Sequence, residues 1–178
     1  MAAASRKDFL STAASATLGL VLSSTAMPSP ALAAKYGDIG RGSPEVLDPA
    51  AAEVDMDVLK SGPVQQALGQ IKDYQSAVRT MQDALAKDSQ ANVHGVVVRE
   101  FDFSKLRATL NTFNTAFDED TQRGTDRLIR AIMQDITELD VANTQKEGIS
   151  RSERRLETMK RKLSKLDQAF SDLLAFNK

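Results

Sequence analysis

Cysteine is absent from this 178-residue chain. Its absence excludes a disulfide framework, a thiolate zinc site, a cysteine nucleophile and an iron–sulfur cluster. It also excludes the lipid-modified cysteine that anchors bacterial lipoproteins. The fold must therefore be held together by packing alone.

Residues that interrupt helices are also scarce. The chain has nine Gly, five Pro and no Trp, and aromatic residues make up 5% of it. Ala, Leu, Lys, Glu, Asp and Gln are abundant, and such a composition favours helices. The 42% of apolar residues suits a folded globular protein, and the length suits one domain. The formal net charge of -1 gives no reason to expect a nucleic-acid partner.

The first 33 residues differ in composition from the rest. Arg6 and Lys7 form a basic start, a weakly apolar run follows over residues 9–26, and Ala31-Leu32-Ala33 is a small-x-small cleavage pattern. The apolar run is too short and too rich in Ser and Thr for a membrane span. Residues 5–10 (SRKDFL) are similar to the twin-arginine export motif S-R-R-x-F-L. We expect residues 1–33 to be a cleavable targeting segment; the alternative is an N-terminal helix that stays attached.

The remaining chain divides into an arm and a bundle. Residues 34–61 are expected to form an irregular N-terminal arm, because Gly and Pro recur in it, and a short helix can form within residues 50–60. Residues 62–178 carry four narrow stripes of apolar residues at alternating spacings of three and four. Four such helices bury their stripes best as an antiparallel up-down four-helix bundle. The predicted fold class is therefore all-α, with an irregular N-terminal arm.

The stripes define the expected helices. Ser61 caps the first, and the second begins near Asp102 or Ser104. The third covers about residues 121–144, with the acidic residues 118–120 stabilising its N-terminus. The fourth opens with the capping-box pattern of residues 150–153, SRSE. The expected inward residues are Ala67, Ile71, Tyr74, Val78, Met81 and Leu85; Phe103, Leu106, Leu110, Phe113 and Phe117; Leu128 or Ile129, Ile132, Ile136 and Leu139; and Leu156, Met159, Leu163, Leu166, Phe170 and Leu173.

We expect no catalytic residues, no bound cofactor and no metal. A di-iron bundle needs Glu-x-x-His on two helices, whereas the only histidine, His94, is expected to be a surface loop residue. The valines of residues 96–98 are expected to lie extended against the bundle. The Gly-rich residues 37–42 lack the strand and the Lys-Ser or Lys-Thr pair of a phosphate loop. Three methionines, Met81, Met133 and Met159, are expected to fill gaps in the core.

Function is therefore expected to lie on the surface. Basic residues are dense in the fourth predicted helix, where they either only solvate the helix or dock on an acidic partner. The N-terminal arm is a second candidate contact, because segments without a core of their own often become ordered on a partner. The candidate docking residues are Arg151, Arg154, Arg155, Arg161, Lys162, Lys165, Tyr36 and Arg41.

The third and fourth predicted helices resemble the C-terminal half of PsbQ-like proteins. In that family an I-x-x-L-D-x-A segment ends helix three, a short turn follows, and helix four ends the chain in a leucine ladder. The resemblance covers about residues 103–178, and the short arm with its acidic residues favours the algal PsbQ-prime type or a close relative. The matching residues are LIRAI (128–132), ITELDVA (136–142), Lys146, Glu153, Leu163, Leu166 and Leu173.

The resemblance implies a function. PsbQ-like proteins are non-catalytic extrinsic subunits of photosystem II that dock on its lumenal core domains and other extrinsic subunits. They stabilise the oxygen-evolving complex and support its retention of calcium and chloride. The implied location is the chloroplast thylakoid lumen, peripheral to the thylakoid membrane. The residues alone leave a second hypothesis open, a bacterial periplasmic helical bundle with a binding or chaperone-like role.

Overall fold

A computed structural model describes residues 45–146 and 148–177 of the chain. These residues form six α-helices, one short 3-10 helix and no strand, which confirms the predicted all-α class. The expected targeting segment, residues 1–33, lies outside the described residues. The elements are η1 (Pro49–Ala51), α2 (Met56–Leu59), α3 (Gly62–Lys87), α4 (His94–Glu100), α5 (Phe103–Asn114), α6 (Glu119–Asn143) and α7 (Glu153–Leu174).

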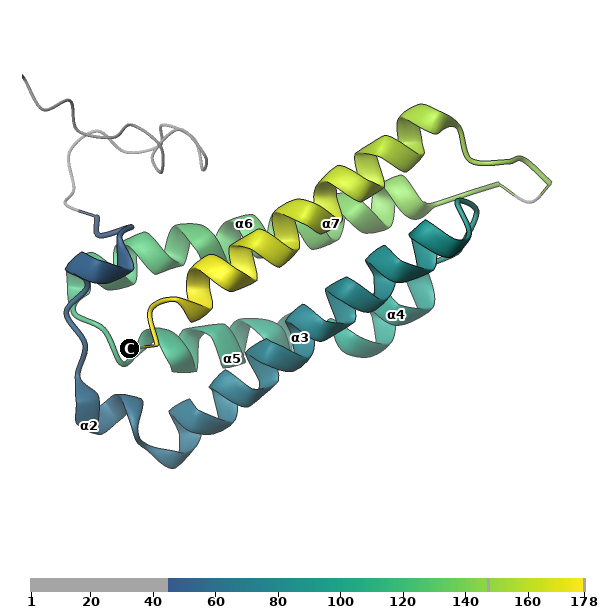
Figure 1. Ribbon diagram of the computed structural model, residues 1–178. Helices are drawn as coiled ribbons and strands as arrows, with labels where there is room; N and C mark the ends of the chain where they lie inside the picture. The colour runs from purple at the N-terminus through teal and green to yellow at the C-terminus, as the bar shows by residue number, and fades with distance from the viewer. Residues whose placement is uncertain (1–44, 147, 178) are drawn as a thin grey trace, which may run out of the picture.

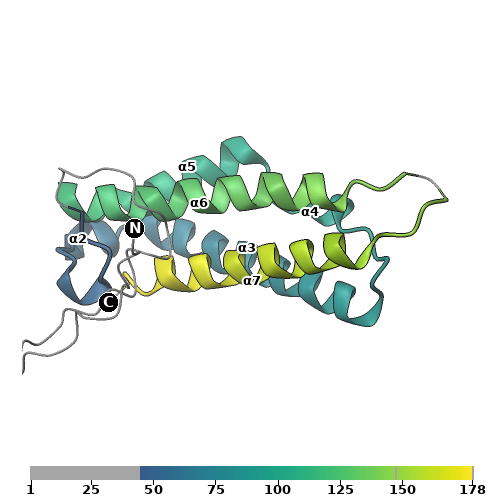
Figure 2. The same cartoon turned by 90° about the horizontal axis from the view of Figure 1, so that it is seen from above.

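The four longest helices lie along one another and give the described part of the chain an elongated shape (Figures 1 and 2). α7 packs on both α3 and α6, and α5 packs on the same two helices. The short helix α4 rests against α3 and α6 at one end, and α2 lies at the other. A continuous core therefore runs between α3, α5, α6 and α7.

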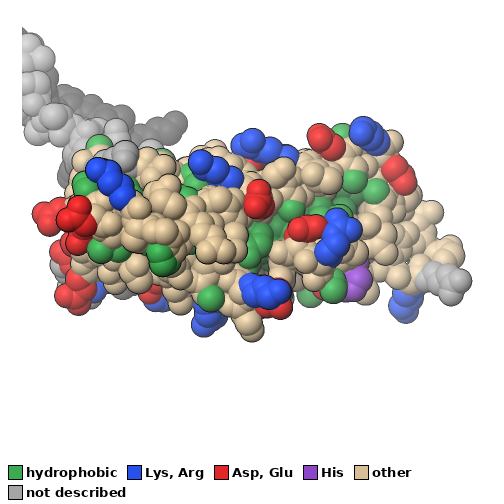
Figure 3. Space-filling view, turned by 90° about the horizontal axis from the view of Figure 1, so that it is seen from below, with side chains coloured by type: hydrophobic (Ala, Val, Ile, Leu, Met, Phe, Trp, Pro, Cys, Tyr) green, Lys and Arg blue, Asp and Glu red, His purple; other side chains and the backbone are tan. Residues whose placement is uncertain are grey.

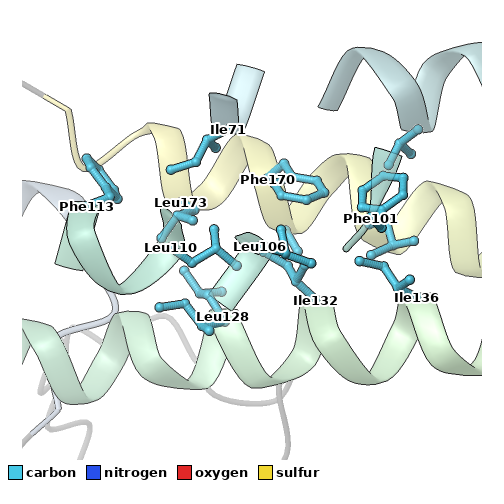
Figure 4. Packing of buried hydrophobic residues seen from close by; sticks show 14 of the residues in the cluster. Ile71, Phe101, Leu106, Leu110, Phe113, Leu128, Ile132, Ile136, Phe170 and Leu173 are labelled. Atoms are coloured by element: carbon cyan, nitrogen blue, oxygen red, sulfur yellow. The ribbon is translucent and has the colours of Figure 1, made fainter. Parts of the chain in front are cut away.

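The core is built from the stripes expected from the sequence. Figure 4 shows side chains from these helices meeting between them, among them Leu106, Ile132 and Phe170, none of which is exposed. Tyr74 is half-buried, and its ring stacks on Phe170 with the centroids 6.4 Å apart. Burying an aliphatic or aromatic side chain contributes about 1.5–3 kcal/mol. The expected inward residues are therefore the main source of stability.

The predictions for one core residue and for one segment were wrong. Phe103 begins α5 and is 40% exposed, so it does not belong to the core. The valines of residues 96–98 are helical, in α4, and not extended. The Asn92 side chain accepts the amide of His94 at 2.9 Å and satisfies one of the free amides with which a helix begins. Of the three valines, Val97 is buried against the core whereas Val98 faces outward.

The helix starts also differ from the expected capping. Ser61 and Ser152 occupy the N-cap positions of α3 and α7, but neither side chain makes a capping hydrogen bond, so the expected capping box is not formed. Asp102 and Asp118 do cap α5 and α6 through their carboxylates. The expected short helix over residues 50–60 is divided into η1 and α2.

The arm is fastened to the start of α6. The Val46 amide donates to the Asp120 carbonyl at 3.1 Å, and Glu45 pairs with Arg127 at 2.8 Å. Gly124 makes the approach possible, because a Cβ there would lie 1.9 Å from the Val46 carbonyl oxygen. Residues from 45 onward therefore form part of the folded unit.

Candidate functional site

Three exposed cations form a stripe along the outer side of α7. Arg154, Arg161 and Lys165 are separated by seven and four residues, which places them on one helix face. None of the three forms a salt bridge within residues 45–146 and 148–177. All three side chains are exposed, and Lys165 lies close enough to Glu138 to contribute to the lowering of its pKa.

Arg155 is also exposed but is partly engaged. Its guanidinium donates to the carbonyl of Val141 at 3.3 Å and to that of Thr144. These carbonyls belong to the last turn of α6 and its C-cap, where a cation is favourable because the end of a helix carries partial negative charge. Arg155 therefore ties α7 to α6 and adds positive charge to the same end of the stripe.

Arg151 was wrongly expected to be a docking residue. It precedes α7 and is only 7% exposed, and its guanidinium donates to the carbonyls of Ser89 and Ala91 and to Asn143 Oδ1. Burial lowers the pKa of this guanidinium from its usual range. Arg151 therefore joins the start of α7 to the connection before α4 and to the end of α6, because its donors reach two carbonyls of that connection and the side chain of Asn143.

Lys162 was likewise wrongly expected to be available. It is 9% exposed, and its ammonium lies 2.6 Å from Asp135 Oδ1 and also pairs with Glu138, both on α6. Burial alone would lower the pKa of Lys162, but the hydrogen bonds to the two carboxylates raise it. The same ammonium lowers the pKa of Glu138. The three groups form a closed ion cluster that fastens α7 to α6.

Beside this ion cluster the surface is hollowed. A groove of about 450 Å³ lies between α6 and α7. Small residues, Ala131 on α6 and Ala169 on α7, leave the space open, and both signs of charge line it, with Lys162 and Lys165 next to Asp135. The side-chain amides of Gln134 and Gln168 also line it, and they already donate to Glu138 and Asp172 at 2.7 Å each. The sequence does not reveal this groove, since finding it requires knowing which face of α6 meets α7.

The side of the molecule that is seen from below Figure 1 carries both signs of charge among the described residues. Figure 3 shows the view from below, with Lys and Arg interspersed among Asp and Glu, and acidic side chains at the α2 end. Asp118 lies at the start of α6, where hydrogen bonds from Thr121 and the Asp120 amide lower its pKa, which confirms its expected capping role. His94 is exposed as expected but starts a helix, with Nδ1 2.7 Å from Asp140.

The described residues contain no group of three or more His, Asp or Glu side chains placed to hold a metal ion. Within the same residues, no helix has the length and hydropathy that a membrane span requires. Tyr36 and Arg41, the candidate docking residues of the arm, lie outside the described residues. No protein-family model matches the chain, and no curated protein or solved structure is significantly similar to it.

Proposed function

We propose that the chain is an antiparallel up-down four-helix bundle that acts as a non-catalytic extrinsic subunit of photosystem II. It docks from the thylakoid lumen on the core domains and neighbouring extrinsic subunits, and it stabilises the oxygen-evolving complex and its calcium and chloride. The resemblance of α6 and α7 to the C-terminal half of PsbQ-like proteins carries this proposal.

The packing of those two helices supports the resemblance. Ile136 and Leu139 of the I-x-x-L-D-x-A segment are fully buried, as are Leu163, Leu166 and Leu173 of the leucine ladder. The apolar residues named here, which belong to the pattern that resembles the family, therefore lie in the core of the bundle. A shared pattern at buried positions is what a shared packing arrangement requires.

The charge distribution supports docking on an acidic surface. Two of the cations expected to dock, Arg151 and Lys162, hold the helices together, and the exposed stripe of Arg154, Arg161 and Lys165 remains on one side. Exposed charges of one sign steer association and orient the partner. Such binding weakens with salt, because the screening length falls from about 8 Å at physiological ionic strength to about 3 Å at 1 M.

Mass spectrometry of photosystem II particles tests the proposal. Particles from the source organism are analysed before and after a wash at about 1 M salt. We expect the polypeptide in the intact particles and its release into the wash. Its absence from particles that retain their other extrinsic subunits would refute the proposal, and recovery only from a periplasmic extract would favour the bacterial alternative.

A further inference from the structure

We propose that residues 39–44 of the N-terminal arm occupy the groove between α6 and α7. The sequence of this segment is IGRGSP, and it directly precedes Glu45, the first described residue. The inference goes beyond the proposed function, because it gives the arm a binding place on the bundle itself and does not involve photosystem II.

The described start of the arm lies on the side of α6 that lines the groove (Figure 1). The arm passes so close to Gly124 that a Cβ there would clash with its backbone, and Glu45 pairs with Arg127 at 2.8 Å. Ala131 and Asp135, which line the groove, follow Arg127 at intervals of four residues. Residues spaced in this way lie above one another on one side of a helix. The chain that precedes Glu45 therefore begins about one helical turn from the groove.

The segment has the length that the groove requires. A helix rises about 1.5 Å per residue, so Asp135 lies about 12 Å along α6 from Arg127. An extended chain covers about 3.3 Å per residue, so about four residues span this distance. Arg41 precedes Glu45 by four residues and would therefore reach the level of Asp135.

The lining suits a peptide segment of mixed polarity. Both signs of charge line the groove, together with side-chain amides, and this combination favours neither a single anion nor a single cation. A peptide backbone carries one donor and one acceptor at most residues. The amides of Gln134 and Gln168 donate elsewhere, but their carbonyl oxygens can accept the backbone amides of the arm. The small side chains of Ala131 and Ala169 leave room for a backbone to approach, and the two glycines of the segment add no bulk.

The one charged residue of the segment has a counterpart in the groove. Asp135 is the acidic residue of the lining, and its Oδ1 accepts from the Lys162 ammonium at 2.6 Å. A carboxylate has a second oxygen that can accept, and Arg41 would supply the donor. The side chain of Asp135 is 14% exposed, so salt screens an ion pair here less than one on the open surface.

The attachment at Glu45 makes weak contacts sufficient. A segment joined to its binding site through a short linker is present there at an effective concentration on the order of millimolar. Contacts that are too weak to hold a free peptide can therefore hold this one. The Glu45–Arg127 pair fixes the point of attachment, because its side chains are only 19% and 17% exposed.

Cross-linking in the full chain tests the inference, because the sequence has no cysteine of its own. Gly42→Cys is combined with Ala131→Cys, which lies in the groove. The matched control combines Gly42→Cys with Arg130→Cys, which is adjacent in the sequence but on the exposed side of α6. We expect an intramolecular disulfide to form at least about tenfold faster in the first pair, because a disulfide needs Cα atoms within about 7 Å.

Two outcomes would overturn the inference. Equal rates in the two pairs would show that the arm does not favour the groove over the rest of α6. A disulfide-linked dimer as the main product of the first pair would show that the groove takes the arm of a second copy.

Trypsin cleavage after Arg41 is a second test that needs no cysteine. Ala131→Phe fills the groove without changing the charge and is expected to speed this cleavage about tenfold, the equivalent of about 1.4 kcal/mol. Ala108→Phe makes the same change on the exposed side of α5 and is expected to leave the rate unchanged, and cleavage after Lys35, outside the segment, is the internal reference. Equal rates after Arg41 in the wild type and both variants would overturn the inference, and the cross-link decides the case if Ala131→Phe does not fold.

Discussion

Replacing Gly124 with alanine should detach the arm from α6. The new Cβ would lie 1.9 Å from the Val46 carbonyl oxygen and 2.7 Å from its carbon, so backbone must move. Alanine by itself favours a helix over glycine by about 1 kcal/mol. The substitution therefore has two opposite effects on stability: it raises the helix propensity of α6, and it disrupts the contact between the backbones of α6 and the arm.

The expected loss exceeds the gain in propensity. Detachment breaks the hydrogen bond from the Val46 amide to Asp120, which contributes about 1 kcal/mol, and the Glu45–Arg127 ion pair, which contributes up to about 1 kcal/mol. It also exposes the half-buried side chains of Val46 and Leu47, at a further cost of about 1–2 kcal/mol. After the gain in helix propensity is subtracted, we expect Gly124→Ala to destabilise the protein by about 2 kcal/mol.

Gly69 provides the matched control. It lies in the exposed face of α3, and a Cβ there would meet nothing within 4 Å. Gly69→Ala should therefore stabilise the protein by about 1 kcal/mol, the opposite sign from Gly124→Ala. Urea unfolding measures both changes, and hydrogen exchange of the Val46 amide reports whether the arm is attached. Equal stabilisation by the two substitutions, with the Val46 amide still protected, would refute this account of the arm.

Four further substitutions test the packing. Arg151→Met should destabilise the protein by about 1–3 kcal/mol, since it leaves the partly buried carbonyls of the 88–93 connection without donors. Arg154→Met should change stability by less than about 0.5 kcal/mol; urea unfolding compares the two, and equal effects would contradict the assignment of Arg151 to the interior. The lowered pKa of Glu138 means that its contribution is complete above its unfolded pKa of about 4.3 and is lost as pH falls through its folded pKa. Glu138→Gln should therefore flatten the acid side of the stability curve below about pH 4.5, and an unchanged acid side would count against the ion cluster. The raised pKa of Lys162 means that its contribution to stability is complete below its unfolded pKa of about 10.4 and is lost as pH rises through its folded pKa. Lys162→Met should therefore remove this alkaline loss of stability. Phe176→Ala should cost about 3–5 kcal/mol in thermal unfolding, because this ring is fully buried near the C-terminus; a change below about 1 kcal/mol would show that the last turn does not belong to the core.

The long helices could be predicted because their patterns are local. The expected third helix, about residues 121–144, agrees closely with α6 at Glu119–Asn143, since a 3.6-residue period repeats through it. α4 could not be predicted in the same way. Three consecutive β-branched residues favour a strand, but the Asn92 side chain starts a helix there and burial of Val97 holds it against the core.

The exposed positive stripe was predictable only in part, because burial of a charge depends on distant residues. Arg151 and Arg154 belong to the same basic run. Arg151 is nevertheless buried, because its guanidinium packs against and donates to carbonyls about 60 residues earlier in the chain. Lys162 is separated from Asp135 by 27 residues, so nothing in the fourth stripe distinguishes it from Lys165. A run of charges therefore identifies the helix that carries the positive stripe, but not which of its side chains are exposed.

Rebinding of the chain without residues 1–33 to salt-washed photosystem II particles tests the central claim most directly. We expect saturable binding of about one copy per photosystem at low salt. Arg154→Glu combined with Arg161→Glu should weaken it by at least about tenfold, whereas Lys105→Glu combined with Arg107→Glu, on α5, should not. A wild-type chain that does not bind saturably to the washed particles would contradict the claim that this bundle is an extrinsic subunit of photosystem II.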